Sequence, residues 1–242
     1  MKVLALDTSS LVASVALMDD RILLGEYILN HKKKTHSREL VFMIEKLLDN
    51  LQVSIKNIDL FAVSKGPGSF TGLRIGITTA KTMAYAMDKP VIAVPTLDAL
   101  AYNIPFCEYI ICPVMDARNN QVYAALYQWA SNGQQRLSEY MAVKIEELVE
   151  NVRKRIGKTG QRIIFTGDGV IIHADFFSNE LGDKCTFTPY NLLFQRASSV
   201  AEIALNLFLN GERGDCFCLT PFYLRKSQAE RMREIEERQQ RN

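Results

Sequence analysis

The 242-residue sequence has no apolar run long enough to cross a membrane, because none reaches the ~18 residues that a membrane helix requires. Its first residues, Met1 to Asp7, also lack the apolar core and the small-residue cleavage site of a signal peptide. The formal net charge is only +2, so the overall balance gives no sign of a dedicated nucleic-acid binder. These absences predict a cytoplasmic globular protein that is not bound to a membrane.

Cysteine and histidine are scarce and are poorly spaced for holding a metal. The five cysteines match no zinc pattern, and Cys216 and Cys218 are expected to lie on one face of a strand. The three histidines include no pair at metallopeptidase spacing, since His31 and His36 are five residues apart. The sequence therefore predicts no metal site and gives a metallopeptidase no support.

What the sequence does contain is a regular alternation of strand-like and helix-like segments. Such alternation predicts an α/β fold of mixed sheets covered by helices. In the first half, the expected strands are 2–7, 11–18, 21–29, 59–64 and 91–94, and the expected helices are 37–51, 70–87 and 96–103.

The second half repeats the opening of the first. A strand at 109–116 ends in Asp116 as the first strand ends in Asp7, and a polar turn and a returning strand follow in both places. This duplication predicts two lobes of related topology. The expected divisions are 1–104, 105–226 and a charged helix or tail at 227–242. The remaining expected elements are a returning strand at 121–127, a helix at 145–156, a strand at 162–165, a turn at 166–169, and a helix at 198–209 capped by Ser198 or Ser199.

A glycine-rich stretch runs from Gly66 to Gly76, and its spacing fits neither a P-loop nor a dinucleotide-binding fingerprint. Gly72, Gly76, Ala80 and Ala84 recur every four residues, which places them on one ridge of helix 70–87. Glycine inside a helix costs ~1 kcal/mol relative to alanine, so another element must approach this ridge closely. That element is either the sheet of the same lobe or a partner's helix, with helix 37–51 as the companion. If a partner's helix covers the ridge, Gly76→Leu should weaken dimerisation and leave the fold intact.

The turn Asp7-Thr8-Ser9 is the second notable feature. An aspartate that ends a hairpin strand before hydroxyl residues can hold a metal and a phosphate in actin-like ATPases. The glycines of such a loop are missing here, so an ordinary turn is the simpler interpretation. The candidates for a vestigial nucleotide-binding site are Asp7, Thr8, Ser9, Asp116, Gly167 and Gly169.

Several of these segments together resemble the TsaB (YeaZ) family, and the resemblance spans nearly the whole chain. The segments are Leu4 to Ser9, His36 to Leu40, Gly66 to Gly76, Asp116 to Arg118 with Val122 and Tyr123, Gly167 to Gly169, and Pro221 to Arg225. The resemblance implies an actin-like fold of two ribonuclease-H-like lobes. It also implies a non-catalytic role in forming N6-threonylcarbamoyladenosine at position 37 of tRNAs that read codons starting with A.

The same resemblance implies the partners. The TsaD subunit, which carries the metal site, performs the transfer, and TsaE joins the complex, so tRNA is reached through the complex. Alone, the chain is expected to form a homodimer through the surface that pairs with TsaD. The implied interface residues are Leu40, Val41, Ile44, Leu47, Leu48, Gly72, Leu73, Gly76, Ala80 and Ala84.

No tightly bound cofactor is expected, although ATP or ADP can act at the level of the complex. The family was once described as a glycoprotease, and no residue pattern here supports that chemistry. The alternative to a scaffold subunit is an actin-like ATPase or kinase that acts alone and uses Asp7 and Asp116 around magnesium.

Overall fold

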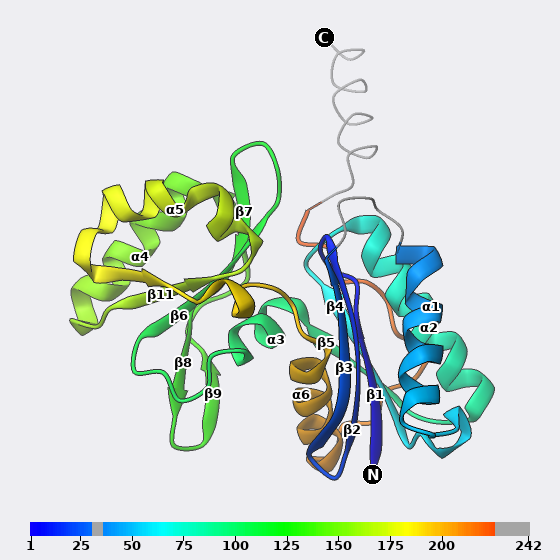
Figure 1. Cartoon of the computed structure of the whole chain (residues 1–242). Coiled ribbons are helices and arrows are strands. Elements are labelled where there is room, and N and C mark those ends of the chain that lie inside the picture. The colour runs from blue at the N-terminus through cyan, green and yellow to red at the C-terminus, as the bar shows by residue number, and fades with distance from the viewer. Residues whose placement is uncertain (31–35, 226–242) are drawn as a thin grey trace, which may run out of the picture.

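The computed structural model describes residues 1–30 and 36–225 and shows two lobes, each built around its own sheet (Figure 1). In the first sheet the strand order is β3-β2-β1-β4-β5, in which β1 is antiparallel to β2 and parallel to β4. The strands are β1 (Lys2–Asp7), β2 (Val12–Asp19), β3 (Ile22–Asn30), β4 (Leu60–Gly66) and β5 (Val91–Pro95).

The second sheet repeats this arrangement with the order β10-β7-β6-β11-β12. Here β6 is antiparallel to β7 and parallel to β11, as β1 is to β2 and β4. The strands are β6 (Ile110–Asp116), β7 (Gln121–Ala124), β10 (Met141–Lys144), β11 (Ile163–Thr166) and β12 (Cys185–Phe187), with the hairpin β8 (Tyr127–Ala130) and β9 (Gly133–Arg136) beside β6. The repeated order confirms the expected α/β fold of two related lobes.

The turns that open the two lobes differ slightly in length. Asp7 lies opposite Ser14 across the first hairpin, whereas Asp116 lies opposite Val122 across the second. The returning strand of the second lobe also ends at Ala124 instead of continuing to residue 127. The duplicated pattern in the sequence therefore marks equivalent strands but not an identical register.

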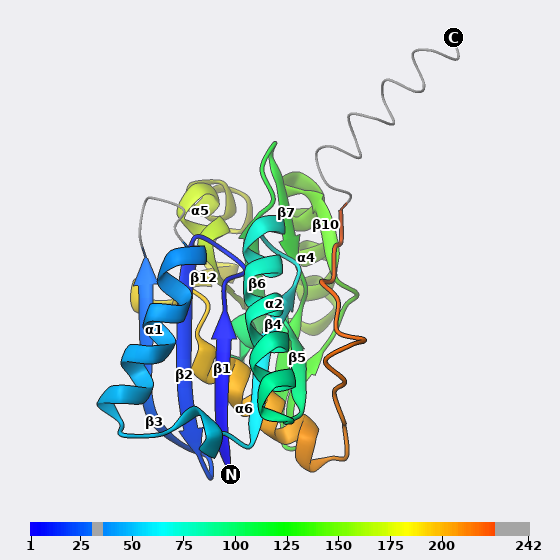
Figure 2. The same ribbon diagram turned by 90° about the vertical axis from the view of Figure 1, so that its right-hand side faces the viewer.

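Helices cover both faces of the first sheet. Figure 2 shows α1 (His36–Asn50) and α2 (Phe70–Met87) side by side on one face, with α6 (Ala197–Leu209) behind the sheet. Leu40, Ile44 and Leu47 of α1 are buried against this sheet, and burying such side chains contributes ~1.5–3 kcal/mol each. The short helix η1 (Ile55–Asn57) links α1 to β4.

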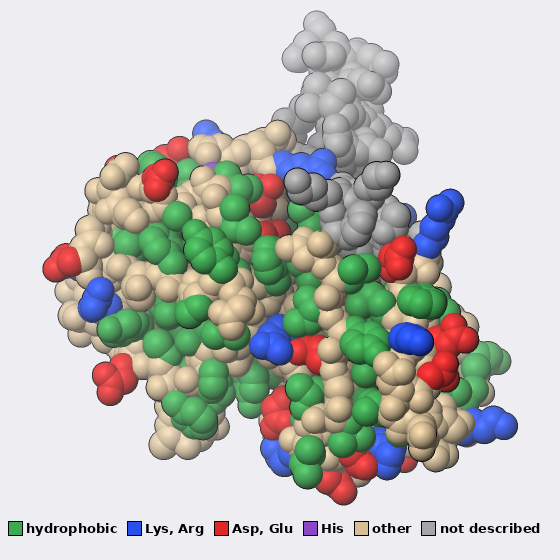
Figure 3. All heavy atoms as spheres, in the orientation of Figure 1, with side chains coloured by type: hydrophobic (Ala, Val, Ile, Leu, Met, Phe, Trp, Pro, Cys, Tyr) green, Lys and Arg blue, Asp and Glu red, His purple; other side chains and the backbone are tan. Residues whose placement is uncertain are grey.

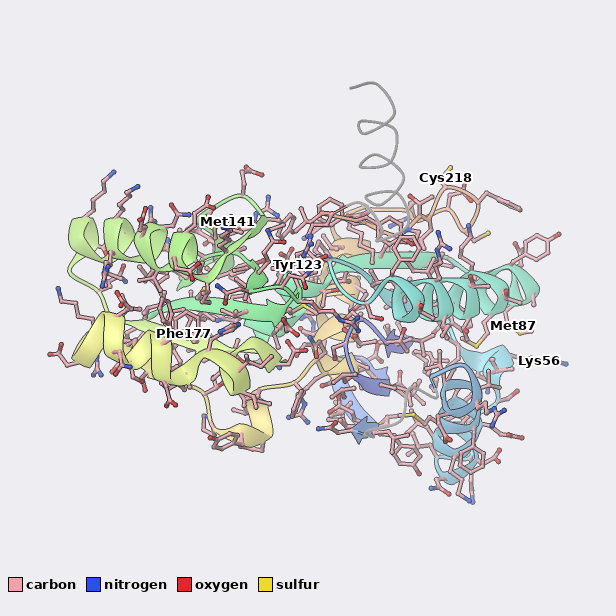
Figure 4. The ribbon with its side chains drawn as sticks, turned by 90° about the horizontal axis from the view of Figure 1, so that it is seen from above. Lys56, Met87, Tyr123, Met141, Phe177 and Cys218 are labelled. Carbon is pink, nitrogen blue, oxygen red and sulfur yellow. The ribbon has the colours of Figure 1, made fainter. Side chains whose placement is uncertain are left out.

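The second lobe has α4 (Ile145–Thr159) and α5 (Asp168–Leu181) on one face, and Phe177 contributes from α5 to the core there (Figure 4). The opposite face packs on α3 (Thr96–Tyr102), which connects the lobes and contacts both β6 and α6. Along the chain, the short helix η2 (Gly182–Lys184) precedes β12 and the short helix η3 (Tyr190–Leu192) follows it. In the view from above, Tyr123 of β7 lies near the junction of the two lobes (Figure 4).

The expected division of the chain at residue 226 needs correction. Helix α6 packs on β1, β2, β4 and β5, so it belongs to the first lobe although it follows the second in the sequence. Leu219 beyond it lies in the core under α1 and α2. The second lobe therefore ends before Ala197, and the segment after it returns to the first. The expected tail at 227–242 lies outside the described residues.

Three further local expectations are wrong. Residues 168–181 form a helix where the sequence suggested only a turn at 166–169. Cys216 and Cys218 lie in a turn and not in a strand. Neither Ser198 nor Ser199 caps α6; instead Glu26, on β3, accepts hydrogen bonds from the Ser198 backbone N–H and hydroxyl.

Candidate functional site

The turn between β1 and β2 contains the polar residues Asp7, Thr8, Ser9 and Ser10, and all four are buried. The Asp7 carboxylate accepts hydrogen bonds from the Ser9 backbone N–H (2.8 Å), from the Ser9 hydroxyl (2.6 Å) and from the Ser64 hydroxyl. The Thr8 hydroxyl donates to the carbonyl of Gly72 at 2.7 Å. These groups therefore bind one another and neighbouring segments, as the groups of a structural turn do.

The glycine-rich loop covers this turn directly. The Ser69 backbone N–H donates to the Ser9 carbonyl at 2.6 Å, and the Ser69 hydroxyl caps the first turn of α2 by accepting from the Gly72 N–H. A Cβ atom at Gly68 would overlap the Ser9 carbonyl, and one at Gly72 would overlap the Thr8 carbonyl. Glycine is needed at both positions because two backbones meet there.

The small-residue ridge of α2 is covered by the chain's own first lobe. Gly72, Leu73, Gly76, Ala80 and Ala84 are all buried, and a Cβ atom at Gly76 would overlap the Thr8 hydroxyl. The placement of these five residues at a partner interface is therefore wrong. Of the two alternatives open in the sequence, the structure supports packing against the sheet of the same lobe.

The apolar stripe of α1 divides in a similar way. Leu40, Ile44, Leu47 and Leu48 are buried in the core, so they serve the fold of the monomer. Of the expected interface residues on α1, only Val41 is largely exposed, at 58%, although Ile44 and Leu48 also line the groove between α1 and α2. Phe42 is equally exposed next to it, and the sequence pattern showed only that it fell off the main stripe.

A groove of about 600 Å³ lies between the outer faces of α1 and α2. Its lining combines apolar side chains with a row of threonines and few charges. The lining residues are Val41, Ile44, Glu45, Leu48, Asp49, Val53, Ser54, Ile55, Thr78, Thr79, Thr82 and Met83. A concave, mainly apolar surface of this kind suits the insertion of side chains from another protein.

In the second lobe, Asp116, Gly167 and Gly169 come together where β6 meets the start of α5. A Cβ atom at Gly167 would overlap the Val114 carbonyl, and one at Gly169 would come within 2.7 Å of the Val114 side chain. The glycines thus let α5 approach β6 closely. Asp168, which the sequence gave no reason to single out from its glycine neighbours, accepts a hydrogen bond from the Asp116 backbone N–H at 3.0 Å.

The environment of Asp168 affects its proton affinity. Burial raises the pKa of its carboxyl to about 6, with the nearby Asp116 charge adding to the rise and the Asp116 backbone N–H opposing it. Because the folded chain holds this proton more tightly than the unfolded chain, the group stabilises the fold fully below about pH 4. That stabilisation is lost as the pH rises through about 6.

In the wild type, this group is therefore expected to lower the free energy of unfolding by roughly 2 kcal/mol between pH 4 and pH 7. In Asp168→Asn this part of the pH dependence should be absent. Urea unfolding of the variant and the wild type across this range measures the effect. Asp175→Asn, at an exposed position on the same helix, serves as the control. Identical pH profiles for Asp168→Asn and the wild type would contradict the assignment.

The remaining expectations concern metals and membranes. Within residues 1–30 and 36–225, no three or more His, Cys, Asp and Glu side chains come together in a way that could hold a metal ion. No helix in the same ranges is both long and apolar enough to span a bilayer.

Comparison with known proteins identifies the family. Residues 23–232 match the family described as TsaD, tRNA N6-adenosine threonylcarbamoyltransferase. A Bacillus subtilis relative, named tRNA threonylcarbamoyladenosine biosynthesis protein TsaB, is 32% identical over 232 residues, which cover 95% of this chain and 96% of the relative. The chain belongs to the TsaB family. The Escherichia coli TsaB is 29% identical over 231 residues, which cover 95% of this chain and 96% of that protein.

A solved structure supports the TsaB fold. A Pseudomonas aeruginosa protein, described as similar to the peptidase YeaZ, superposes with a TM-score of 0.76 and covers 93% of this chain and 99% of that one. Its sequence identity is 24%, so this likeness concerns the fold alone. The TsaB resemblance in the sequence is thus confirmed.

Proposed function

We propose that this chain is a non-catalytic subunit in the formation of N6-threonylcarbamoyladenosine on tRNA and that it pairs with TsaD through the groove between α1 and α2. The observation that carries the pairing is this groove, since it is an open, mainly apolar hollow whose lining includes the exposed side chain of Val41. The name of the Bacillus subtilis relative, a tRNA threonylcarbamoyladenosine biosynthesis protein, supports the process.

The match to the TsaD family also supports this mode of pairing. Residues 23–232 resemble the transferase, so α1 and α2 have counterparts in it. Two related chains can meet through equivalent helices in a pseudo-twofold arrangement, and a second copy of this chain can occupy the same position. The proposal therefore includes a homodimer when TsaD is absent, and TsaE joins the paired chains.

The state of the Asp7 turn supports a non-catalytic role. Its carboxylate is buried and accepts several hydrogen bonds from its own chain, which leaves it poorly placed to meet a metal-bound nucleotide. In this proposal the chain acts in the cytoplasm and holds no tightly bound cofactor. ATP or ADP then acts at the level of the complex with TsaD and TsaE.

Val41→Asp combined with Thr82→Arg is expected to weaken pairing with TsaD at least ~100-fold, because both substitutions place charges in the lining of the groove. Both wild-type residues are exposed in the single chain, so the fold should remain. Isothermal titration calorimetry with purified TsaD gives the affinity, and a sizing column gives the homodimer fraction of each variant.

Ile171→Asp is the matched control for this test. Ile171 lies on α5 of the second lobe and is 56% exposed, which is close to the exposure of Val41. Its substitution should leave pairing unchanged. The proposal fails if wild-type chain and TsaD form no complex with or without TsaE and nucleotide, or if the groove variant pairs as tightly as wild type.

A further inference from the structure

The last described segment, residues 219–225, crosses from the first lobe to the second and is called the C-terminal strap below. It continues the chain that runs beside α2 (Figure 2), where Cys218 also lies (Figure 4). Lys81 of α2 donates to the Leu219 carbonyl at 3.1 Å, and the Phe222 backbone N–H donates to the Lys65 carbonyl at 2.6 Å. The strap is thus fixed along the flank of α2 that faces away from α1.

The strap also reaches the second lobe at two points. The guanidinium of Arg225 donates to the Ala117 carbonyl at 2.7 Å. The ring of Phe222 lies 5.6 Å from that of Tyr140. Residues from α2, from the turn after β6 and from the segment before β10 therefore meet along one short piece of chain.

Besides Lys81, five cationic residues lie at or next to the contacts of the strap although they are far apart in the sequence. Arg225 belongs to the strap, and Lys65 and Arg74 contact it through a hydrogen bond. Arg118 lies next to Ala117, which the strap contacts, and Arg136 stacks on Tyr140, which the strap also contacts. These cationic residues are Lys65, Arg74, Arg118, Arg136 and Arg225. Residues 221–225 span at most ~18 Å when fully extended, so the points at which these residues meet the strap lie within that distance of one another.

Aromatic rings hold two of these cations in place. The guanidinium of Arg74 lies 4.0 Å above the ring of Phe70 and donates to the Tyr223 hydroxyl at 3.1 Å, while Tyr223 stacks on Phe70 at 4.4 Å. The guanidinium of Arg136 lies 4.0 Å above the ring of Tyr140. Cation–π contacts orient a guanidinium without neutralising its charge.

The described part of the chain provides no ion-pair partner for these five cations, although the charge of Asp98 acts on Arg136. Within residues 1–30 and 36–225, none of the five cations forms an ion pair. Of the neighbouring carboxylates, Asp98 accepts from the Tyr127 and Tyr140 hydroxyls, and Asp116 accepts from the Arg118 backbone N–H. By contrast, the face in Figure 3 mixes charges of both signs without an extended basic area.

We propose that the C-terminal strap and its five cations form an RNA-binding surface of this subunit. Arginines stacked on aromatic rings suit the phosphates and unstacked bases of single-stranded RNA, as in a tRNA loop or end. The choice of RNA over an acidic protein rests on the proposed function, which places the chain beside tRNA. The α2 residues that contact the strap, Arg74 and Lys81, are not among those that line the groove, so TsaD and RNA can bind together.

The test uses the full chain, a fluorescein-labelled single-stranded RNA 15-mer and a tRNA transcript, with fluorescence anisotropy between 50 and 300 mM KCl. Neutralising three to five phosphates is expected to give a slope of log K against log salt of about −2 to −4. Arg118→Glu with Arg136→Glu is expected to weaken binding at least ~10-fold and to reduce the slope by about 2. Both arginines are exposed, so folding should be unaffected, and thermal unfolding checks this.

Arg162→Glu is the matched control, because Arg162 is also exposed and lies 5.2 Å from the ring of Tyr109. It precedes β11 at the end of the sheet opposite Asp116, as the pairing of Ile163 with Ile110 shows. The Arg162→Glu variant should bind RNA as tightly as the wild type does. Failure of the wild type to bind either RNA at 50 mM KCl, or an equal loss in Arg162→Glu, overturns the inference. Displacement of the RNA by poly-glutamate of equal charge at equal concentration also overturns it, and indicates an acidic protein.

Pairing with TsaD, measured on the same samples, separates this inference from the proposed function. The Arg118→Glu, Arg136→Glu variant should pair normally, and the Val41→Asp, Thr82→Arg variant should bind RNA normally. If the wild-type chain pairs with TsaD but binds no RNA, only the strap surface is rejected. If the wild-type chain binds RNA but does not pair with TsaD, only the groove is rejected.

Discussion

Gly72→Leu is expected to yield no soluble folded chain, and Gly72→Ala to lower the free energy of unfolding by at least ~3 kcal/mol. Even one added Cβ atom overlaps the backbone carbonyl of Thr8. That carbonyl cannot move aside easily, because the Thr8 hydroxyl is itself hydrogen-bonded to the Gly72 carbonyl at 2.7 Å. Since domains of this kind are stable by only ~5–15 kcal/mol, such a strain at the centre of the first lobe is severe.

Gly157→Ala is expected to have the opposite effect. Gly157 also lies inside a helix, α4. Apart from its chain neighbours and the backbone of its own helix, no atom lies within 4 Å of a Cβ atom added there. Alanine should therefore raise the free energy of unfolding by ~0.5–1 kcal/mol through helix propensity alone. Urea unfolding of both variants measures the contrast, and a wild-type midpoint for Gly72→Ala would show that the loop and the turn are not in close contact.

The same geometry changes what Gly76→Leu should do. The sequence alone allowed a soluble variant with weaker dimerisation. In the structure a Cβ atom at Gly76 would overlap the Thr8 hydroxyl, and Ala80 and Ala84 are buried on the same face. The four-residue spacing correctly indicated close approach of another element. It contained no information about which element approaches, because a strand and a partner's helix require the same small residues.

The topology could be predicted because the periodic signals were strong. Strands β1, β4 and β6 are nearly continuous apolar runs that end in turns, and α1 and α2 carry apolar residues at helical spacing. Helix α5 was missed because its apolar residues do not follow one stripe: Val170 is buried, whereas Ile171 and Ile172 are exposed. The return of α6 to the first sheet was missed because the spacing of apolar residues predicts a helix but does not show which sheet the helix packs on.

The functional surfaces were harder to predict for the same reason. The stripe of α1 was correctly identified as apolar, but only the fold shows that its main side packs inward and leaves Val41 outside. The cations along the strap come from positions between 65 and 225, so a net charge of +2 gave no hint of them. Tertiary contacts that bring distant residues together decide both surfaces.

Glu26→Ala is expected to lower the free energy of unfolding by ~3–5 kcal/mol, because it removes the acceptor for four hydrogen bonds that join β3 to the start of α6. The Glu26 side chain is only 5% exposed. Its carboxylate accepts from the Arg196 guanidinium at 3.0 and 2.6 Å and from the Ser198 backbone N–H and hydroxyl at 2.9 and 2.8 Å. Without it, a partly buried charge and a helix N-terminus both lose their partner.

Arg153→Ala provides the comparison, since it breaks an ion pair with Glu180 in which both side chains are exposed, at 49% and 37%. Its cost should stay below ~1 kcal/mol, as for most surface pairs. Glu26→Gln should fall between the two, because the amide oxygen still accepts from Ser198 while the charge facing Arg196 is lost. Chemical unfolding at pH 7 gives all three values. If Glu26→Ala and Arg153→Ala lowered the free energy of unfolding equally, the apolar face of α6 alone would hold this helix to the first sheet. The Glu26 carboxylate would then contribute little to its attachment.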